Sequence, residues 1–174
     1  NIAFKNCDIL RSGGIAMDIQ NGDCAQVHDI TFTNINVEFN AFDTPPVYQA
    51  TDEMRYEKEN ETDVPMLINI SNPPFRNKDN ESDWGIPYSN YEEIGKKGEH
   101  GTVHNVTFMN INVYYDDALP RENGKPIVKM CFYSFFPEII YSDVSIENIT
   151  VNGERLKKED VRFEQLAVKN FSFK

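Results

Sequence analysis

The feature that most constrains the fold is a short unit that recurs along the chain. Each copy begins with Asn or Asp, alternates apolar and variable residues, and carries an Asn at its sixth position. Self-similarity of this kind indicates a repeat architecture and takes precedence over local propensity. The copies read NIAFKNCDIL (1–10), DITFTNINVEFN (29–40), NVTFMNINVYY (105–115) and DVSIENITVNG (143–153), and a fifth begins as NFSFK (170–174).

An Asn at the sixth position separates two short runs in each copy. Alternation with a period of two predicts β-strands with one buried face, and Asn tolerates a left-handed backbone better than other non-glycine residues. Two strands around an Asn bend, repeated, predict a parallel β-solenoid in which the Asn side chains stack and share amide hydrogen bonds. The alternative is a β-sandwich hairpin with the Asn in its turn, but hairpins favour Asn-Gly turns. These bends are Asn6, Asn34, Asn110 and Asn148, each followed by Ile or Cys.

Three further alternating segments are expected to supply the third strand of successive coils. In the first of them the apolar residues fall on one face, and Ala16, Asp18 and Gln20 fall on the other. On later coils the positions equivalent to Asp18 are expected to be Asn69 and Lys129. The 28 residues between Asn6 and Asn34 suit one three-strand coil with its turns. The three segments are 15–20, 66–71 and 127–133.

Two long polar segments, 41–64 and 72–101, interrupt the repeats. We expect them to be insertions at one corner of a single all-β domain spanning residues 1–174, a right-handed β-solenoid of about 4 coils. Part of the first insertion, residues 53–58, could form a short helix, and 157–164 predicts a short turn or helix. Because the chain opens and closes inside repeats, we expect it to be the C-terminal part of a longer protein. Its N-terminal remainder would cover the first coil.

The composition limits the partners. The chain has 174 residues, 40% of them hydrophobic, and a formal net charge of −11. An acidic balance disfavours nucleic acid and anionic membrane surfaces, and no apolar run is long enough to span a membrane. We expect no metal and no other cofactor, since His100 and His104 lie four apart without a metal-ligand motif. The three cysteines are expected in the interior as small apolar residues rather than in a disulfide; they are Cys7, Cys24 and Cys131.

The units resemble those of the right-handed parallel β-helix carbohydrate-active enzymes, most closely the polygalacturonase-like glycoside hydrolases of family 28. The resemblance lies in the NVTFxNINV-type units, in GGIAMDIQNGDCAQVHDITFTNINVEF (13–39) and in the closing DVSIENITVNG. It implies hydrolysis of glycosidic bonds in a polysaccharide, a cleft along one sheet, and a secreted or cell-surface location. The family's catalytic Asn-x-Asp, Asp-Asp and Gly-His-Gly motifs are expected on coils that would precede Asn1. Its Gly-x-Arg-x-Lys motif, which grips a substrate carboxylate, falls on Gly14, Ala16 and Asp18. A neutral or differently charged glycan therefore fits better than a uronic acid.

Six residues are candidates for the site. Asp18 is the outward acid of its strand and the candidate catalytic carboxylate, although glycoside hydrolysis needs a pair. Gln20 and Asn69 are predicted to hydrogen-bond the glycan. The aromatic residues of the second insertion could stack on sugar rings or anchor their own loop; they are Trp84, Tyr88 and Tyr91. The sequence therefore predicts the C-terminal part of a polysaccharide-acting hydrolase, with a non-catalytic glycan-binding or structural solenoid as the alternative.

Overall fold

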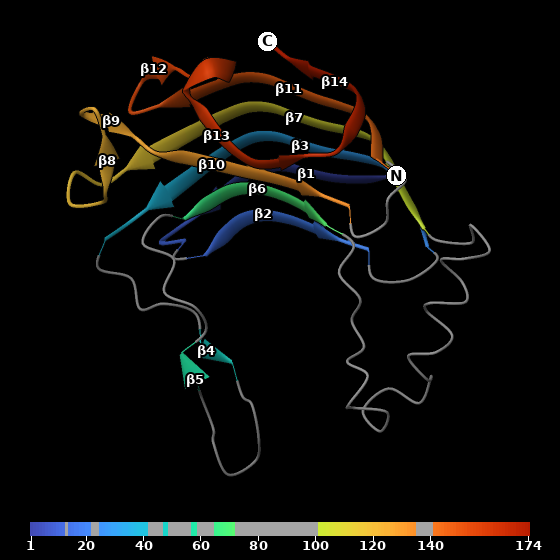
Figure 1. Ribbon diagram of the computed structural model, residues 1–174, viewed down its shortest axis with the longest axis horizontal. Helices are drawn as coiled ribbons and strands as arrows, with labels where there is room; N and C mark the ends of the chain where they lie inside the picture. Colours follow the sequence, from blue (N-terminus) through green and yellow to red (C-terminus); the bar gives the residue numbers. More distant parts are fainter. Residues whose placement is uncertain are drawn as a thin grey trace.

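The computed structural model describes residues 1–12, 14–21, 25–41, 47–48, 57–58, 65–71, 101–134 and 141–174. These residues form an all-β structure built on two sheets of mainly parallel strands (Figure 1). In the described part of the chain the one helical element is a 3-10 turn, η1 (Lys158–Asp160). No helix there is long and apolar enough to cross a membrane.

The larger sheet holds the repeated units. Its strands follow the order β1, β3, β7, β11 and β12, and β14 also pairs with β11. The bounds are β1 (Ile2–Ile9), β3 (Gln26–Phe39), β7 (Thr102–Tyr115), β11 (Tyr141–Val151), β12 (Glu154–Arg155) and β14 (Val168–Phe173). Equivalent residues pair in parallel, as in Ile2 with Ile30 and Phe32 with Phe108. Parallel pairing rules out the hairpin alternative for these units, because the two arms of a hairpin run antiparallel.

The smaller sheet holds the expected third strands, in the order β2, β6, β10 and β13. Their bounds are β2 (Ile15–Gln20), β6 (Met66–Ser71), β10 (Val128–Tyr133) and β13 (Val161–Leu166). The chain alternates between the two sheets, and buried side chains of both sheets form one hydrophobic core. Within that core Phe32 stacks on Phe4 at 4.8 Å and on Phe108 at 5.0 Å between ring centroids.

The expected asparagine bends are confirmed, and a second set accompanies them. The sixth-position residues adopt left-handed φ angles near 55°, at Asn6, Asn34, Asn110 and Asn148. Their amides form a ladder with Nδ2 to Oδ1 distances of 3.0, 3.0 and 2.7 Å. The first positions of the four later units are also left-handed, which was not predicted; they are Asp29, Asn105, Asp143 and Asn170. Each long strand therefore turns two corners rather than one.

The register of the smaller sheet corrects one prediction. Asp18 pairs with Asn69 as expected, but Asn69 pairs with Cys131, and Lys129 pairs with Met66. The pairing shifts between Lys129 and Met130, as happens where a β-bulge adds a residue to one strand. Asn69, Cys131 and Gln165 therefore follow Asp18 across the sheet.

The same register overturns the interior placement of one cysteine. Cys131 is buried but lies outside the hydrophobic core, on the face that carries Asn69. Cys7 does pack against the core, and both thiols are free. Cys24 lies outside the described residues.

The two insertions do not share one corner. The first connects the C-terminal end of β3 to the start of β6, whereas the second connects the C-terminal end of β6 to the start of β7. Because β3 and β6 run in opposite directions, the two insertions leave the sheets at opposite sides (Figure 1). Within the first insertion, β4 (Val47–Tyr48) pairs antiparallel with β5 (Glu57–Lys58). The last two residues of the helix expected at 53–58 are thus in a strand. A second short hairpin joins β8 (Arg121–Glu122) to β9 (Lys125–Pro126).

Candidate functional site

The structure brings Asp18, Gln20 and Asn69 together on the outward face of β2 and β6. Gln20 Nε2 donates to Asp18 Oδ2 at 2.6 Å, and Asn69 Nδ2 donates to Asp18 Oδ1 at 2.7 Å. Both carboxylate oxygens are therefore held by amide donors from two strands. We call these residues, with Ser71, the Asp18 cluster. Their proximity follows from the alignment of IAMDIQ with MLINIS, because Asp18 and Asn69 are the fourth residues of their strands.

The Asp18 cluster has two residues that are exposed to solvent and two that are buried. Asp18 and Gln20 are exposed, whereas Asn69 is 7% exposed and Ser71 is 8% exposed. Asn69 Nδ2 also lies 3.0 Å from Ser71 Oγ, so its amide is fixed between two partners. Asp18 and Gln20 can meet a ligand directly, while Asn69 acts by orienting the Asp18 carboxylate. A direct contact of Asn69 with the glycan stays a prediction.

Along the smaller sheet, among the strands that the structure describes, no second carboxylate lies in catalytic range of Asp18. Retaining and inverting glycosidases place their carboxyl groups about 5 to 9.5 Å apart. Along the smaller sheet the residues that follow Asp18 are amides or a thiol, and the first acid is Glu164 on β13. Three strand spacings separate β2 from β13, which is about 14 Å. The Asp18 cluster can therefore accept and donate hydrogen bonds, but these strands do not complete an acid–base pair.

The outward thiol beside Asn69 is not an activated nucleophile. Burial, and then the nearby Glu164 carboxylate, raise the pKa of Cys131. The thiol therefore stays protonated, and protonated thiols are poor nucleophiles and metal ligands. Glu164 itself is paired with Lys129, with Nζ 3.5 Å from Oε1.

The two described histidines lie together in the larger sheet, and no potential metal site occurs among the described residues. His28 lies in β3 and pairs with His104 of β7, and their rings are stacked at 5.1 Å between centroids. No group of three or more potential metal ligands occurs among the described residues. His100 and the aromatic candidates Trp84, Tyr88 and Tyr91 lie outside the described residues.

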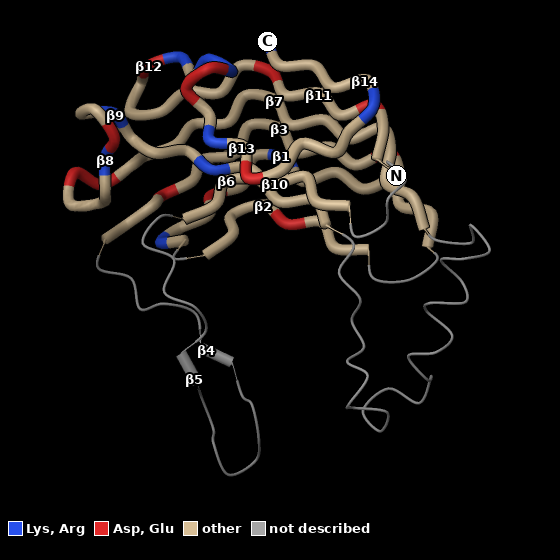
Figure 2. Tube along the Cα trace, viewed as in Figure 1, with Lys and Arg blue, Asp and Glu red and all other residues tan. Residues whose placement is uncertain are grey.

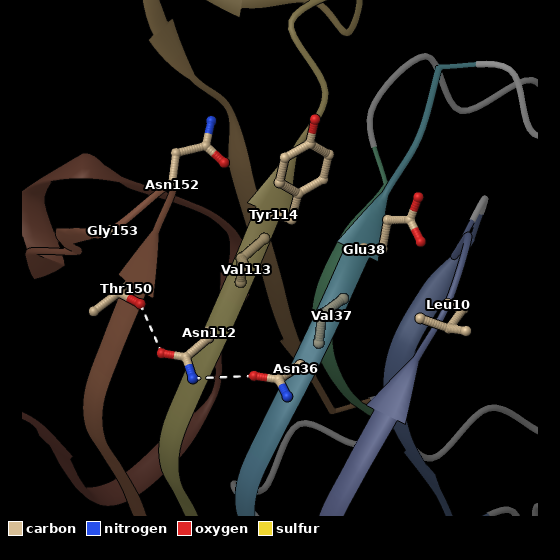
Figure 3. A pocket seen from close by; sticks show the side chains of 10 residues that line it. All are labelled: Leu10, Asn36, Val37, Glu38, Asn112, Val113, Tyr114, Thr150, Asn152 and Gly153. Atoms are coloured by element: carbon tan, nitrogen blue, oxygen red, sulfur yellow. Dashed lines mark hydrogen bonds between the residues drawn. The ribbon is translucent and has the colours of Figure 1, made fainter.

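A groove that contains none of the six predicted site residues lies on the larger sheet (Figure 3). It has a volume of about 530 Å³ and lies on the outward side near the C-terminal ends of β3, β7 and β11. Tyr114 is its most prominent aromatic side chain and is 62% exposed. The segment NINVYY carried the signal, since alternation that buries Val113 and Tyr115 must turn Tyr114 outward. The other lining residues are Leu10, Asn36, Val37, Glu38, Asn112, Val113, Thr150, Asn152 and Gly153.

Comparison with known proteins gives no relative. No protein-family model, curated protein or solved structure matches this chain. What the chain binds must therefore be inferred from its own residues. Charged residues are sparse along the middle of the long strands and are frequent in the β8–β9 hairpin and near β12 (Figure 2). Near that hairpin Lys125 pairs with Asp160 at 2.7 Å and Arg162 with Glu122 at 2.6 Å.

Proposed function

We propose that the two sheets are walls of a right-handed parallel β-helix of about 4 coils. The support is the alternation of the chain between two parallel sheets, together with the amide ladder that links Asn6, Asn34, Asn110 and Asn148. Connections between parallel strands of one sheet are right-handed in the great majority of proteins. A stack of this kind presents flat, rigid outer faces, which suits the binding of an extended polymer.

On this scaffold we propose a polysaccharide-binding function, as the C-terminal part of a protein similar to the family 28 glycoside hydrolases. The observation that carries the proposal is the exposed Asp18 carboxylate, fixed between the Gln20 and Asn69 amides. Asp18 accepts hydrogen bonds from sugar hydroxyls, Gln20 contributes its remaining donor and its carbonyl, and Asn69 holds the carboxylate in place. A neutral glycan fits because a carboxylate stands where a uronic acid would require a cation. Trp84, Tyr88 and Tyr91 remain predicted stacking residues, and a secreted or cell-surface location follows from the resemblance.

The second candidate function is a non-catalytic glycan-binding module on the same fold. It is favoured by the described strands, where the nearest acid along the smaller sheet is about three strand spacings from Asp18, or about 14 Å. In that case Asp18 binds and does not catalyse. Catalysis would need a second carboxylate from outside the described residues.

The test is a glycan array with the full chain, followed by a reducing-end assay on each glycan that binds. Wild type is expected to bind a neutral polysaccharide, and Asp18→Ala is expected to weaken that binding at least about tenfold. Asp18→Asn should also weaken it, because its new NH₂ group faces the Gln20 or Asn69 donor. Asp117→Asn, at an exposed loop carboxylate paired with Arg121, is the matched control and should bind as wild type.

The outcomes separate the candidates. Binding with release of reducing ends supports the hydrolase, and binding without release supports the binding module. If wild type binds no neutral glycan, or if Asp18→Ala binds as well as wild type, the Asp18 cluster is not a glycan site.

A further inference from the structure

The groove on the larger sheet is built from two rows of outward side chains that run across neighbouring strands. The lower row is a ladder of short polar side chains, and the upper row, two residues further along the chain in each case, includes the longer side chains of Glu38 and Tyr114 (Figure 3). The floor between the rows is Val37 and Val113, which are 1% and 3% exposed. The lower row is Asp8, Asn36, Asn112 and Thr150, and the upper row is Leu10, Glu38, Tyr114 and Asn152.

The lower row offers fixed donors and acceptors with unused capacity. Asn36 donates to Asp8 at 2.7 Å, Asn112 donates to Asn36 at 3.1 Å, and Thr150 donates to Asn112 at 2.9 Å. A carboxamide has two N–H groups and two lone pairs. The ladder uses one N–H and one lone pair of each Asn, so one of each remains for a ligand. A hydroxyl group, which both donates and accepts, matches that remaining pair.

The upper row supplies an aromatic face beside a carboxylate. Tyr114 is 62% exposed and lies directly across the strand pair from Glu38. Within the described part of the chain no hydrogen bond to the Tyr114 hydroxyl occurs. An exposed tyrosine presents an apolar ring and a polar tip, which is the combination that stacks on a sugar while bonding its hydroxyls. Leu10, 72% exposed, closes the opposite rim.

Two hydrogen bonds from the side chain of Asn152, directly after β11, fix the backbone of Tyr115 beside Tyr114. Asn152, left-handed at φ 50°, accepts from the Tyr115 N–H at 2.8 Å and donates to the Tyr115 carbonyl at 2.9 Å. These bonds continue the β7–β11 ladder beyond its last backbone pair. A site whose groups are already fixed loses less entropy when a ligand binds.

The charges of the groove select against anions. Among the described lining residues Glu38 is the one carboxylate, and none is Lys or Arg. The lower row ends at Asp8, a further negative group beside β3. A uronate, phosphate or sulfate would meet repulsion without a compensating cation.

We propose that this groove is a second saccharide site, which binds an uncharged glycan chain across β3, β7 and β11. Tyr114 stacks on a sugar ring, while Asn36 and Asn112 exchange hydrogen bonds with its hydroxyls and Glu38 accepts one more. The site lies on the other sheet from the Asp18 cluster and shares no residue with it, so either site can fail without the other.

The test uses the full chain on an array of neutral oligosaccharides that includes cellohexaose, xylohexaose and mannohexaose, with hexagalacturonate as the anionic comparison. Wild type is expected to bind at least one neutral probe and not hexagalacturonate. The glycan binding that remains in Asp18→Ala is assigned to the groove. Tyr114→Ala should weaken this remaining binding by about tenfold, because the stacking of the Tyr114 ring on a sugar is lost. Tyr114→Phe keeps the ring and should stay within about threefold of wild type. Because Tyr114 is exposed, the urea midpoint of Tyr114→Ala should match that of wild type.

Backbone NMR shifts of the wild type with the bound neutral probe locate the contact. Changes are expected at Asn36, Asn112 and Tyr114. If these amides do not move, or if Tyr114→Ala binds as wild type while Asp18→Ala abolishes all binding, the groove is not a saccharide site and the Asp18 cluster stands alone. If Tyr114→Ala abolishes all binding and Asp18→Ala has no effect, the groove is confirmed and the proposed function at Asp18 fails.

Discussion

At the scale of single residues, Asn110 occupies a left-handed bend and the centre of the amide ladder at once. Its φ is 56°, it donates to Asn34 at 3.0 Å, and it accepts from Asn148 at 2.7 Å. Asn110→Ala loses both hydrogen bonds and adds left-handed strain, so we expect a loss of about 2–4 kcal/mol in the free energy of unfolding. Asn110→Gly avoids the strain and should lose about 1 kcal/mol less.

Asn112 is the matched control for that bend, because it sits in a ladder of the same kind without a left-handed φ. Asn112→Ala should therefore cost less than Asn110→Ala in urea unfolding. Equal losses for the Ala and Gly variants of Asn110 would mean that the bend contributes no strain.

Asp29, whose backbone is left-handed, should make the stability of the folded state depend on pH. Hydrogen bonds from the His28 ring and then from the Asn105 amide lower the pKa of Asp29 below its usual 3.8. The ionised carboxylate therefore stabilises the folded state above pH 3.8, and that contribution is lost as the pH falls through the lowered pKa. Asp29→Asn keeps an acceptor for Asn105 but cannot titrate. We expect its melting temperature to fall less than that of wild type between about pH 5 and pH 2.5. Parallel melting curves for the two proteins would contradict this assignment.

At the scale of strands and sheets, the aromatic stack links β1, β3 and β7. Phe108 is fully buried, whereas Phe4, at the end of the stack, is 46% exposed. Phe108→Ala should destabilise the fold by about 3–5 kcal/mol, because it removes a buried ring and leaves a cavity. Phe4→Ala should cost about 1 kcal/mol, since much of its ring already faces solvent. Urea unfolding of both variants measures the difference, and similar losses would show that the stack is no better packed at its centre than at its end.

The strands also show which features of the fold could be predicted from the sequence and which could not. Parallel pairing of the units followed from their common length and alternation, and so did the contact of Asp18 with Asn69. The shift between Lys129 and Met130 could not be read, because either neighbour satisfies the alternation and a bulge moves the pairing by one residue. The bend at Asp29 was readable, since every complete unit starts with Asn or Asp. The groove around Tyr114 depends on rows contributed by four separate segments, which alternation along one strand does not reveal.

At the scale of the whole molecule, both sheets end in strands that pair on one side only within the described part of the chain, β1 and β2. Ile2 and Phe4 on β1 are apolar and 53% and 46% exposed. An exposed apolar edge is a template for pairing with another chain, so we expect residues 1–174, prepared alone, to self-associate as their concentration rises. Phe4→Lys places a charge on that edge and should shift the protein toward monomer in sedimentation velocity. Tyr114→Lys places the same charge on the face of the central strand β7 and should associate as wild type. Association that is equally reduced by both variants would mean that general repulsion, rather than the β1 edge, controls assembly.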